Sequence, residues 1–419
     1  MKILTISNAP WDDRNSVGNT QSNWFSNWPN TEIRSMYTRE AYPNNTCCSS
    51  YYRVTIKDIA KHIFSREEIG SSISHIDIST SKKTIENNLI GSVKGWKRSA
   101  LQNIVEIAYS SKLWLNKKLK TNIEEFCPDI IFCFAIAEPF RYNIIRYAKK
   151  HTKAKVVMWV ADDVYGQTTE MNFFKRVIYR KRYRKMFAMA DKVYGVSQML
   201  CEEYTDLYNI SITPLYKGCD LAPNIKSVGN PIKIVYAGNL LYGRDKTLVA
   251  LVSEIAKINK EEIKIQLSIY SGTPVTNEIR NSLNINGSSV LYDARPYDEI
   301  KKIMKEADIV LHVESFDKQQ MKNVRLSFST KIIDCMQSGA VMMVIGPKGI
   351  ASVEYPRGIR GVVVVDDLSK LHQSINTIIK NPSQLLYDAE KIYDYAKRNH
   401  ELSAVRNKLQ KDFHTIIVS

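Results

Sequence analysis

Short apolar runs alternate with longer segments of mixed character along the chain. The runs Ile130–Phe134, Lys155–Val160 and Val341–Ile345 have the length and composition of strands that are buried on both faces. Segments with a helical pattern, such as 140–150 and 296–305, lie between runs of this kind. Strands that alternate with helices favour a parallel sheet with right-handed crossovers, so the pattern predicts an α/β fold.

One opening occurs twice in the sequence. Residues 1–8 and 232–239 each form an apolar strand that ends at an asparagine and leads through a glycine-bearing loop into a helical pattern. This is how a Rossmann-like domain begins. A chain of 419 residues is also too long for one typical core. We therefore expect twin Rossmann-like domains that face each other across a cleft.

The residues 219–231 are loop-like, with two prolines and a glycine, and mark the expected domain boundary. We expect an N-terminal domain over 1–226 and a C-terminal domain over 227–383. Helices over 384–419 are expected to return to the first domain. The polar, tyrosine-bearing residues 40–100 predict loops and helices on the open side of the first domain.

The stretch 311–346 has the pattern strand, polar loop, helix, turn, strand. Its polar residues 314–323 are expected to leave the sheet as a loop. Ser327 and Ser329 are expected to cap a helix that begins near Thr330. Because the backbone amides at a helix start attract negative charge, this stretch predicts an anion pocket.

Two charged side chains lie on the first turns of that predicted helix. Lys331 adds a positive charge beside the amides, and Asp334 follows three residues later on roughly the same face. A diphosphate at the amides and a ribose diol at the carboxylate would fit this arrangement. The alternative is an ordinary strand–helix–strand turn with a solvated lysine and aspartate.

The loop 238–246 is similar to a P-loop but departs from it at two positions. A Walker A sequence needs lysine, then serine or threonine, where Arg244 and Asp245 stand here, so we exclude a nucleoside triphosphatase. What remains is a glycine-bearing loop whose Arg244 and Lys246 can meet a diphosphate. The loop after the first strand has no G-x-G-x-x-G pattern, so a dinucleotide cofactor is not supported.

Asp162 and Asp163 follow the strand Lys155–Val160 at its carboxyl end. Open α/β sheets place their ligands at this edge, so the two acids are candidates for substrate contact in a cleft. The alternative is that they cap the next helix. The sequence does not separate the two interpretations.

The charge balance favours an anionic partner, since 59 basic residues against 43 acidic ones give +16. Residues 173–187 contain seven basic side chains, several aromatic ones and no acid, and their apolar positions form no single helical stripe. Our preferred partner for this segment is an anionic membrane surface, met by Arg180, Lys181 and Arg184. A solvated face is the second alternative, and nucleic acid is the third.

The sequence lacks the patterns typical of metal sites, signal peptides and membrane spans, and this limits the cofactors and compartments to be expected. The seven cysteines form no C-x-x-C pair and have no histidines at zinc spacing, so no metal site is expected. The first nine residues are too short and too soon followed by charges for a signal peptide. No apolar run approaches the ~20 residues of a membrane span. We expect a cytoplasmic protein that associates peripherally with the inner face of the membrane.

Four elements in order resemble the retaining glycosyltransferases of the GT-B fold, family 4. They are Ala-Asp-x-Val-x-x-Val-Ser at 190–197, Tyr-Ala-Gly-Asn at 236–239, Glu-Ala-Asp-Ile-Val-Leu at 306–311, and Ser-Phe-Ser-Thr-Lys-Ile-Ile-Asp-Cys-Met-Gln-Ser-Gly at 327–339. The first 150 residues resemble the family only in strand pattern. The resemblance implies a C-terminal domain that binds a nucleotide-sugar and an N-terminal domain that binds the acceptor.

The resemblance also predicts which carboxylates bind the sugar and the ribose of the donor. In the family's E-x7-E motif, one glutamate binds the sugar and the second binds the ribose. Leu326 and Asp334 occupy these two positions here, so the first carboxylate is missing. Glu314 and His312 are candidates to replace it.

The family's phosphate-binding arginine corresponds to Asn239, and its lysine partner to Arg244 or Lys246. We therefore expect Arg244 and Lys331 to act catalytically on the diphosphate. The other expected donor-binding residues are Gly238, Asn239, Lys246, Ser327, Phe328, Ser329, Thr330 and Asp334. The expected acceptor-side residues are Gly18, Asp162 and Asp163.

The implied activity is transfer of a sugar from a nucleotide-diphosphate-sugar to a glycan or lipid-linked acceptor, with retention, in surface polysaccharide or glycolipid synthesis. Preorganised cations and amides can stabilise the leaving diphosphate without a metal, so we expect no cofactor besides the donor substrate. One alternative is a nucleotide-sugar epimerase of the same fold. Another, from a different class, is a basic nucleic-acid-binding protein, although we expect no nucleic acid partner.

Overall fold

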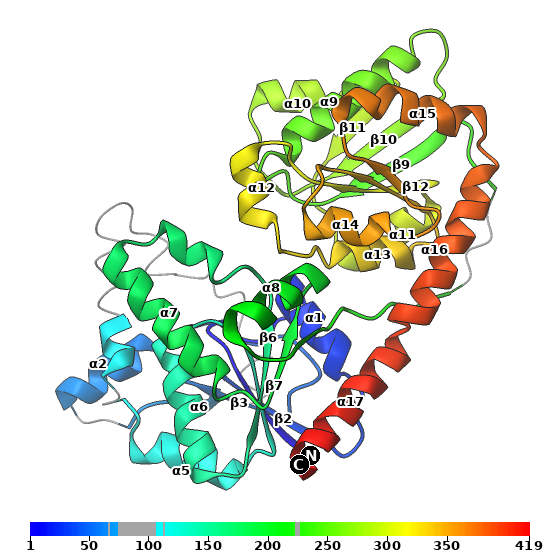
Figure 1. The fold of residues 1–419 in the computed structure, drawn as a ribbon. Helices are drawn as coiled ribbons and strands as arrows, with labels where there is room; N and C mark the ends of the chain where they lie inside the picture. The colour runs from blue at the N-terminus through cyan, green and yellow to red at the C-terminus, as the bar shows by residue number, and fades with distance from the viewer. Residues whose placement is uncertain (66–67, 74–105, 112–113, 223–226) are drawn as a thin grey trace. The chain divides into compact units, whose positions relative to one another are not determined.

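The structure is a computed structural model that describes residues 1–65, 68–73, 106–111, 114–222 and 227–419 (Figure 1). It divides into two compact units. Unit 1 comprises Met1–Leu215 together with Arg406–Ser419, and unit 2 comprises Tyr216–Val405. The division thus falls before the boundary expected at residue 226, and the chain returns to unit 1 only from Arg406 onward.

Unit 1 is built on an eight-stranded sheet with the order β4-β3-β2-β1-β5-β6-β7-β8. All neighbouring pairs run parallel except β3 and β4, which are antiparallel. Its strands are β1 Lys2–Ile6, β2 Glu32–Tyr37, β3 Ser50–Arg53, β4 Ser71–Ile73, β5 Ile130–Phe134, β6 Lys155–Val160, β7 Lys192–Gly195 and β8 Ile212–Pro214. Because β1 pairs with both β2 and β5, the strand order reverses there, as in other doubly wound sheets.

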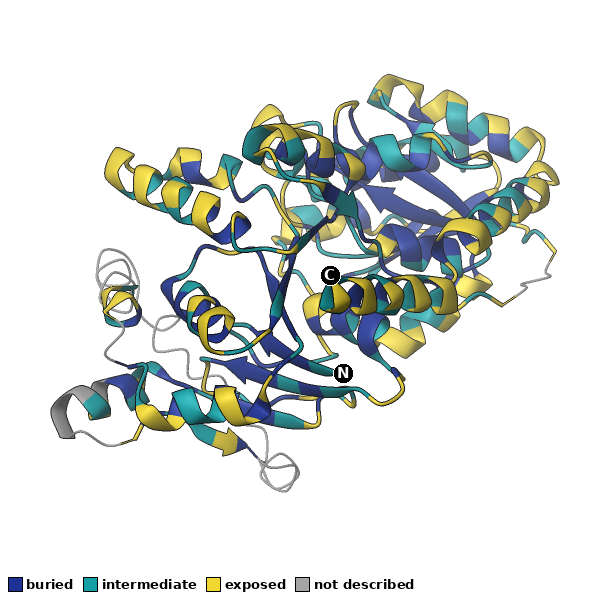
Figure 2. Ribbon diagram, turned by 60° about the horizontal axis from the view of Figure 1, so that its bottom comes forward, coloured by how far each residue is buried: buried dark blue, intermediate teal, exposed yellow. Residues whose placement is uncertain are grey.

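The helices of unit 1 cover this sheet, whose strands are mostly buried (Figure 2). They are α1 Ser16–Phe25, α2 Ile56–Ser65, α5 Lys117–Phe126, α6 Pro139–His151, the 3-10 helix η1 Gly166–Glu170, α7 Phe173–Phe187, α8 Gln198–Tyr208 and the end of α17 Leu402–Val418. An aromatic cluster ties α17 to the sheet. Phe413 of α17 lies 6.0 Å from Phe25 and 6.4 Å from Phe132 of β5, between ring centroids. The C-terminal helix therefore completes the core of unit 1.

Unit 2 has a six-stranded, wholly parallel sheet with the order β11-β10-β9-β12-β13-β14. Its strands are β9 Ile232–Ala237, β10 Ile265–Tyr270, β11 Ser289–Tyr292, β12 Ile309–Val313, β13 Val341–Ile345 and β14 Val363–Val365. Its helices are α9 Arg244–Ile258, α10 Asn277–Leu283, α11 Tyr297–Glu306, α12 Lys318–Val324, α13 Lys331–Gln337, α14 Ala351–Arg357, η2 Leu368–Lys370, α15 Leu371–Lys380 and α16 Gln384–His400. The strand order reverses between β9 and β12, which pair in the middle of the sheet.

Several predicted elements are confirmed at the predicted bounds, notably β5, β6, β13 and α7. The expectation for 40–100 is wrong in its described part, because β3 and β4 add two strands to the sheet. The rest of that region, 74–100, lies outside the described residues. This pairing buries Tyr51 and Tyr52 of β3. Along the sequence, the polar residues around them gave no indication of a strand.

Two predicted loops contain helices. The glycine-bearing loop expected after the first strand ends early, since α1 begins at Ser16. The Asn15 side chain accepts a hydrogen bond from the Gly18 amide and caps this helix. The loop expected over 314–323 contains α12, whose start is capped by Asp317. No residue of α12 is buried, so its sequence carries no apolar stripe that would have indicated a helix.

In the portion of the chain that the structure describes, no helix combines the length and the apolar character needed to span a bilayer. The helices expected over 384–419 are α16 and α17, which are separated at Glu401.

Candidate functional site in unit 2

The carboxyl ends of β9 and β12 lie side by side where the strand order of unit 2 reverses. In open α/β sheets this is the position at which ligands bind. The loop after β9 begins at Gly238, and the loop after β12 begins at Glu314. Helix α13 starts close by at Lys331 and contacts β12. The candidate site is therefore built from these two loops and the start of α13.

Arg244, the first residue of α9, is held tightly inside unit 2. Its Nη2 lies 3.0 Å and 2.9 Å from the two carboxylate oxygens of Glu314, and its Nε donates to the carbonyl of Val313 at 3.1 Å. Its Nη1 donates to Asn239 Oδ1 at 2.9 Å. The Glu314 side chain is only 3% exposed. The arginine is thus oriented toward the site, but its charge is balanced by a buried carboxylate.

Glu314 remains a carboxylate despite its burial. Burial raises the pKa of Glu314, but the hydrogen bond and charge of His312 and then the charge of Arg244 outweigh it and leave this pKa below its ordinary value. His312 Nε2 lies 3.1 Å from Glu314 Oε1, and both side chains are buried. Glu314 is therefore already paired with His312 and Arg244, so its carboxylate is engaged inside unit 2. Leu326 itself is buried in the core.

Lys331 is the contrasting cation. Its side chain is exposed, and its ammonium makes no hydrogen bond or ion pair with any residue that the structure describes. A Cβ built on Gly238 would lie 2.8 Å from Lys331 Nζ, so the missing side chain at 238 lets the ammonium lie over the loop. Crowding by surrounding protein atoms, and then the charge of Arg244, lower the pKa of Lys331. Because an anion would relieve both effects, this ammonium is the natural place for one.

The predicted capping of α13 is wrong. Thr330 occupies the N-cap and its side chain makes no capping hydrogen bond. The Ser329 amide donates to the Ser352 hydroxyl at 2.9 Å, and that hydroxyl donates to the Ser327 carbonyl at 3.1 Å. These contacts fix the turn through the neighbouring α14 rather than through a local cap. The Ser329 amide is therefore not available to an anion, and the positive charge here rests mainly on Lys331.

Asp334 is held by two partners that sequence reasoning did not bring together. Its Oδ1 accepts hydrogen bonds from Lys217 Nζ at 2.7 Å and from the Tyr297 hydroxyl at 2.8 Å. Lys217 Nζ also donates to the Tyr297 hydroxyl at 3.0 Å. Within the described parts of the chain, Asp334 Oδ2 accepts no hydrogen bond. One carboxylate oxygen thus fixes the side chain and the other stays available.

Lys217 was missed because nothing in its local sequence marks it. It lies in the loop after β8, and its side chain is 5% exposed. A buried ammonium needs a counter-charge, and Asp334 supplies it across a large sequence separation. The Tyr297 ring lies under the same ammonium at 5.1 Å. Burial, and then the charge of Asp334, raise the pKa of Tyr297, so this phenol stays a hydrogen-bond donor.

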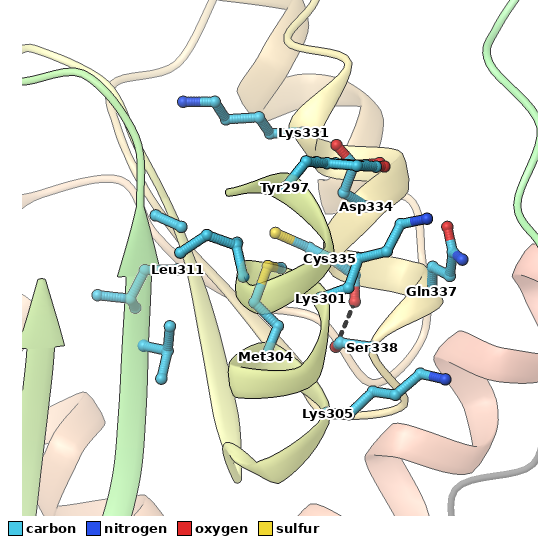
Figure 3. Close-up of a pocket in the computed structure, with 13 residues that line it drawn as sticks. Tyr297, Lys301, Met304, Lys305, Leu311, Lys331, Asp334, Cys335, Gln337 and Ser338 are labelled. Carbon is cyan, nitrogen blue, oxygen red and sulfur yellow. Dashed lines mark hydrogen bonds between the residues drawn. The ribbon is translucent and has the colours of Figure 1, made fainter. Parts of the chain in front are cut away.

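A small cavity of about 90 Å³ lies beside these residues, between α11, α13 and the strands β9 and β12 (Figure 3). Figure 3 shows Met304, Leu311 and Cys335 lining it, with Asp334 and Tyr297 together at one end. A volume of this size holds about three waters. The cavity is therefore too small for a nucleotide, which would lie over the loops instead. Burial raises the pKa of Cys335 to about 12, so its sulfur is a thiol.

Three further residues, Asn239, Lys246 and Phe328, are predicted from the sequence to bind the donor. Asn239 shapes the loop, since its side chain also accepts from the Leu241 amide at 3.2 Å, and Lys246 is exposed. Phe328 is buried, 5.0 Å from Tyr216 and 5.2 Å from Tyr355 between ring centroids. The Phe328 side chain therefore packs in the core.

The predicted acceptor-side residues of unit 1 are explained mainly by packing. A Cβ on Gly18 would lie 2.0 Å from the carbonyl oxygen of Asp12, so close helix–loop packing requires glycine. Asp163 Oδ1 accepts from the Gly166 amide and the Tyr204 hydroxyl, each at 2.8 Å. These contacts favour the capping interpretation for Asp163. Asp162 is exposed.

The three residues expected to meet a membrane differ in their surroundings. Arg180 is half-buried: its Nε donates to the Thr168 hydroxyl at 2.9 Å, and its guanidinium lies 4.0 Å from the centre of the Tyr165 ring. Lys181 and Arg184 are exposed on α7.

Comparison with solved structures identifies the fold. The HepE protein of Anabaena, in complex with UDP and glucose, matches with a TM-score of 0.62 at 10% identity over 99% of this chain and 100% of that one. The sucrose-phosphate synthase of Thermosynechococcus elongatus matches with a TM-score of 0.61 at 10% identity, and all of both chains is covered. WaaG, a glycosyltransferase involved in lipopolysaccharide biosynthesis, matches with a TM-score of 0.56 at 12% identity over 98% of each chain.

No family model and no curated protein sequence matches the chain. The structural matches cover nearly the whole chain, so they confirm the expected GT-B fold with its two Rossmann-like, parallel-sheet units. At identities this low they carry the fold alone. Among the residues that the structure describes, no three His, Cys, Asp or Glu side chains are grouped as a metal site.

Proposed function

We propose that this protein is a glycosyltransferase whose unit 2 binds a nucleotide-diphosphate-sugar and whose unit 1 binds the acceptor. The single observation that carries the proposal is the unbalanced ammonium of Lys331 over Gly238, next to the available oxygen of Asp334. These groups stand at the strand reversal of a GT-B unit, where a ligand is expected. A cation and a carboxylate side by side match the two parts of a nucleoside diphosphate.

The diphosphate would lie against Lys331, with Arg244 behind it. Negative charge grows on the diphosphate as the bond to the sugar breaks, and fixed cations stabilise that charge without rearranging. Arg244 is fixed by Glu314, Asn239 and the Val313 carbonyl, so its position is set before the ligand arrives. In this proposal no metal is needed. The absence of a side chain at Gly238 leaves room for the phosphates beside the ammonium.

The ribose would be bound by Asp334 through Oδ2. Lys217 and Tyr297 hold Oδ1, so they position the carboxylate for the two ribose hydroxyls. The position of the sugar carboxylate in related motifs is Leu326 here, and it is buried. We therefore propose that backbone groups of unit 2 contact the sugar.

The proposal also covers the stereochemistry of the transfer, the acceptor and the cellular site at which the enzyme acts. We propose transfer with retention to a glycan or lipid-linked acceptor, in the synthesis of a surface polysaccharide or glycolipid. Support comes from the fold shared with WaaG, a glycosyltransferase involved in lipopolysaccharide biosynthesis. The basic helix α7 and the net charge of +16 support work at the inner, anionic face of a membrane.

The proposal is tested first by a ligand screen. UDP, GDP, ADP, CDP and dTDP, with their common sugar conjugates, are added to the full chain, and the melting temperature is followed. A specific donor should raise the melting temperature in a concentration-dependent way, because it binds only the folded state. The stabilising nucleotide-sugar is then incubated with lipid-linked and glycan acceptors, and the anomeric configuration of the product is read by NMR.

Stabilisation by one nucleotide series together with a glycosylated product of retained configuration is the expected result. A melting temperature that no nucleotide changes would overturn the donor site. Turnover of the sugar without any acceptor would overturn the transferase in favour of the epimerase alternative. An inverted product would leave the transferase and overturn retention.

A further inference from the structure

Helix α7 of unit 1 exposes four large apolar side chains at its start. Phe173 is 66% exposed, Phe174 79%, Val177 49% and Ile178 53%. At 3.6 residues per turn, positions i, i+1, i+4 and i+5 fall on one side of a helix, within an arc of roughly 140°. We call this set the apolar face. The Asn172 side chain caps the helix by accepting from the Lys175 amide at 2.9 Å, so the first turn is formed.

A second, separate apolar group explains why the sequence showed no single stripe. Tyr183, Met186 and Phe187 are buried, and the Phe187 ring lies 4.4 Å from that of Tyr208. This group anchors the C-terminal half of α7 to unit 1, on the side of the helix opposite to the apolar face. Both halves of α7 thus turn the same side toward unit 1, and the apolar face on the other side stays exposed.

The seven basic side chains of α7 also divide into two sets. Four are bound to unit 1: Lys175 and Arg182 form ion pairs with Glu106, Arg176 donates to the Met171 carbonyl, and Arg180 to Thr168. The other three, Lys181, Arg184 and Lys185, are exposed and make no hydrogen bond or ion pair within the described parts of the chain. We call these three the basic cluster.

The basic cluster continues the apolar face along the same side of the helix. Lys181 lies four residues after Val177, Arg184 lies seven residues after Val177, and Lys185 lies seven residues after Ile178. Spacings of four and seven place residues on the same side of a helix. A free cation cannot contribute to an apolar protein interface without a counter-charge. An anionic bilayer offers both acyl chains for the apolar face and phosphates for the cluster. Single exposed apolar residues need no explanation, but four adjoining ones do.

We propose that the first two turns of α7 insert into the boundary between lipid headgroups and acyl chains of an anionic membrane, while Lys181, Arg184 and Lys185 contact the lipid phosphates. The proposal names the membrane-binding surface of the proposed enzyme. It rests on the proposed function only in that a lipid-linked acceptor would explain why the enzyme binds a membrane. Binding itself is independent of catalysis. It differs from simple electrostatic adsorption, because part of it is apolar and survives high salt.

Flotation with vesicles tests the apolar part. The full chain is mixed with phosphatidylcholine vesicles with or without phosphatidylglycerol, at low and high salt. The wild type should float with the anionic vesicles and retain part of this binding at high salt. In the variant Phe173→Ser/Phe174→Ser, partitioning onto the anionic vesicles should fall at least about tenfold, and no binding should remain at high salt. The reason is that the variant lacks the two aromatic side chains that the bilayer would bury. The control, Ile263→Ser/Leu386→Ser, changes two apolar residues of unit 2 that are 45% and 46% exposed, and it should float like the wild type.

The basic part is tested by the variant Lys181→Glu/Arg184→Glu/Lys185→Glu, which should no longer distinguish anionic from neutral vesicles. Its control, Lys260→Glu/Lys264→Glu/Lys380→Glu, makes the same change in net charge at exposed lysines of unit 2 and should bind as the wild type does. Insertion is measured directly with Phe174→Trp and lipids brominated along the acyl chain. Fluorescence quenching greater than that of the wild type supports insertion, and equal quenching overturns it.

Three other outcomes would overturn the proposal. Loss of self-association in the Phe173→Ser/Phe174→Ser variant, with unchanged flotation, would assign the apolar face to a second copy of the chain. Loss of binding to duplex DNA or to RNA in the basic variant, again with unchanged flotation, would assign the cluster to nucleic acid. Equal flotation of every variant and control would return the helix to a solvated face. The melting-temperature shift with the donor nucleotide should be the same in every variant, which separates a failure here from a failure of the donor site.

Discussion

The two units offer the same topological position for a ligand but treat charge there differently. In unit 1 the strand order reverses between β1 and β5, and the side chains after these strands are paired among themselves. Asn8 donates to Glu138, whose other oxygen lies 3.2 Å from Arg141, and Arg141 Nε donates to the Ile6 carbonyl at 3.3 Å. Arg141 is only 4% exposed. Unit 1 thus balances its cation internally.

In unit 2 one cation is balanced in the same way and a second is not. Arg244 pairs with Glu314 as Arg141 does with Glu138, whereas Lys331 is exposed and makes no ion pair with the described residues. The comparison teaches that the fold supplies two equivalent positions, and that the unbalanced ammonium distinguishes the one suited to an anionic donor.

The largest effect is expected for Glu314→Gln, which removes the charge that balances Arg244. Breaking a buried ion pair leaves an uncompensated charge, so the free energy of unfolding should fall by about 3–5 kcal/mol in urea titrations. The matched change in unit 1, Glu138→Gln, should cost less because Glu138 is 29% exposed. Since the pKa of Glu314 is lowered in the folded state, its stabilising contribution is present above the ordinary carboxyl pKa and is lost as the pH falls through the folded pKa.

A double variant sharpens this prediction. Arg244→Met/Glu314→Leu removes both charges and should recover much of the lost stability, because an apolar pair costs no desolvation of charge. If Glu314→Gln is as stable as the wild type, or the double variant is no better than the single one, the buried pair is not what fixes Arg244.

Removing the unbalanced cation should have the next largest effect. Lys331→Met keeps the length of the side chain and removes its charge, so nucleoside diphosphate binding should weaken by about 1.5–3 kcal/mol, roughly 10- to 150-fold. Isothermal titration calorimetry measures it. Lys264→Met, at an exposed position elsewhere in unit 2, is the control and should leave the affinity unchanged. An unaltered dissociation constant for Lys331→Met would place the diphosphate somewhere else.

A smaller effect is expected for Asp334→Asn. The amide offers one acceptor oxygen where the carboxylate offers two, so a ribonucleotide should lose about 1 kcal/mol of binding. The 2′,3′-dideoxy analogue cannot use the carboxylate and should bind wild type and variant alike. Equal losses for both ligands, measured by competition, would separate Asp334 from the ribose.

The smallest expected effect is a pH dependence of nucleotide binding. The pKa of Lys331 is lowered in the folded protein, so its ammonium loses its proton at a lower pH than a free lysine would. Affinity should fall as the pH rises through the lowered pKa of Lys331. The variant Lys331→Arg keeps its charge and should not show this fall. A pH profile identical in the two proteins contradicts a role for this ammonium.

Much of the fold could be predicted from the sequence. The strands β5, β6 and β13 and the helix α7 have the predicted bounds, because apolar runs and charge runs are local features of the chain. Ser197 caps α8, with its hydroxyl accepting from the Leu200 amide at 3.1 Å, and serine is a common residue at this local position. The strands that were missed, β3 and β4, are short and lie among polar residues, so periodicity did not reveal them.

The candidate site was only partly predictable. The sequence placed Gly238, Lys331 and Asp334 at one edge of a parallel sheet, because topology alone decides which strand ends meet. It could not show that Phe328 is buried in an aromatic cluster or that Arg244 is balanced by Glu314. Residues of the same type can be core or ligand contact, and the local sequence is the same in both cases.

By itself the sequence determined the α/β class, the two Rossmann-like openings and the charge of α7, because each follows from residues that are neighbours along the chain. Only the tertiary structure decided that Lys217 holds Asp334 and that α7 exposes Phe173 and Phe174 while burying Phe187. Such pairings join residues far apart in sequence or opposite sides of one helix. Their energies come from desolvation and from distance, and both exist only once the chain has folded.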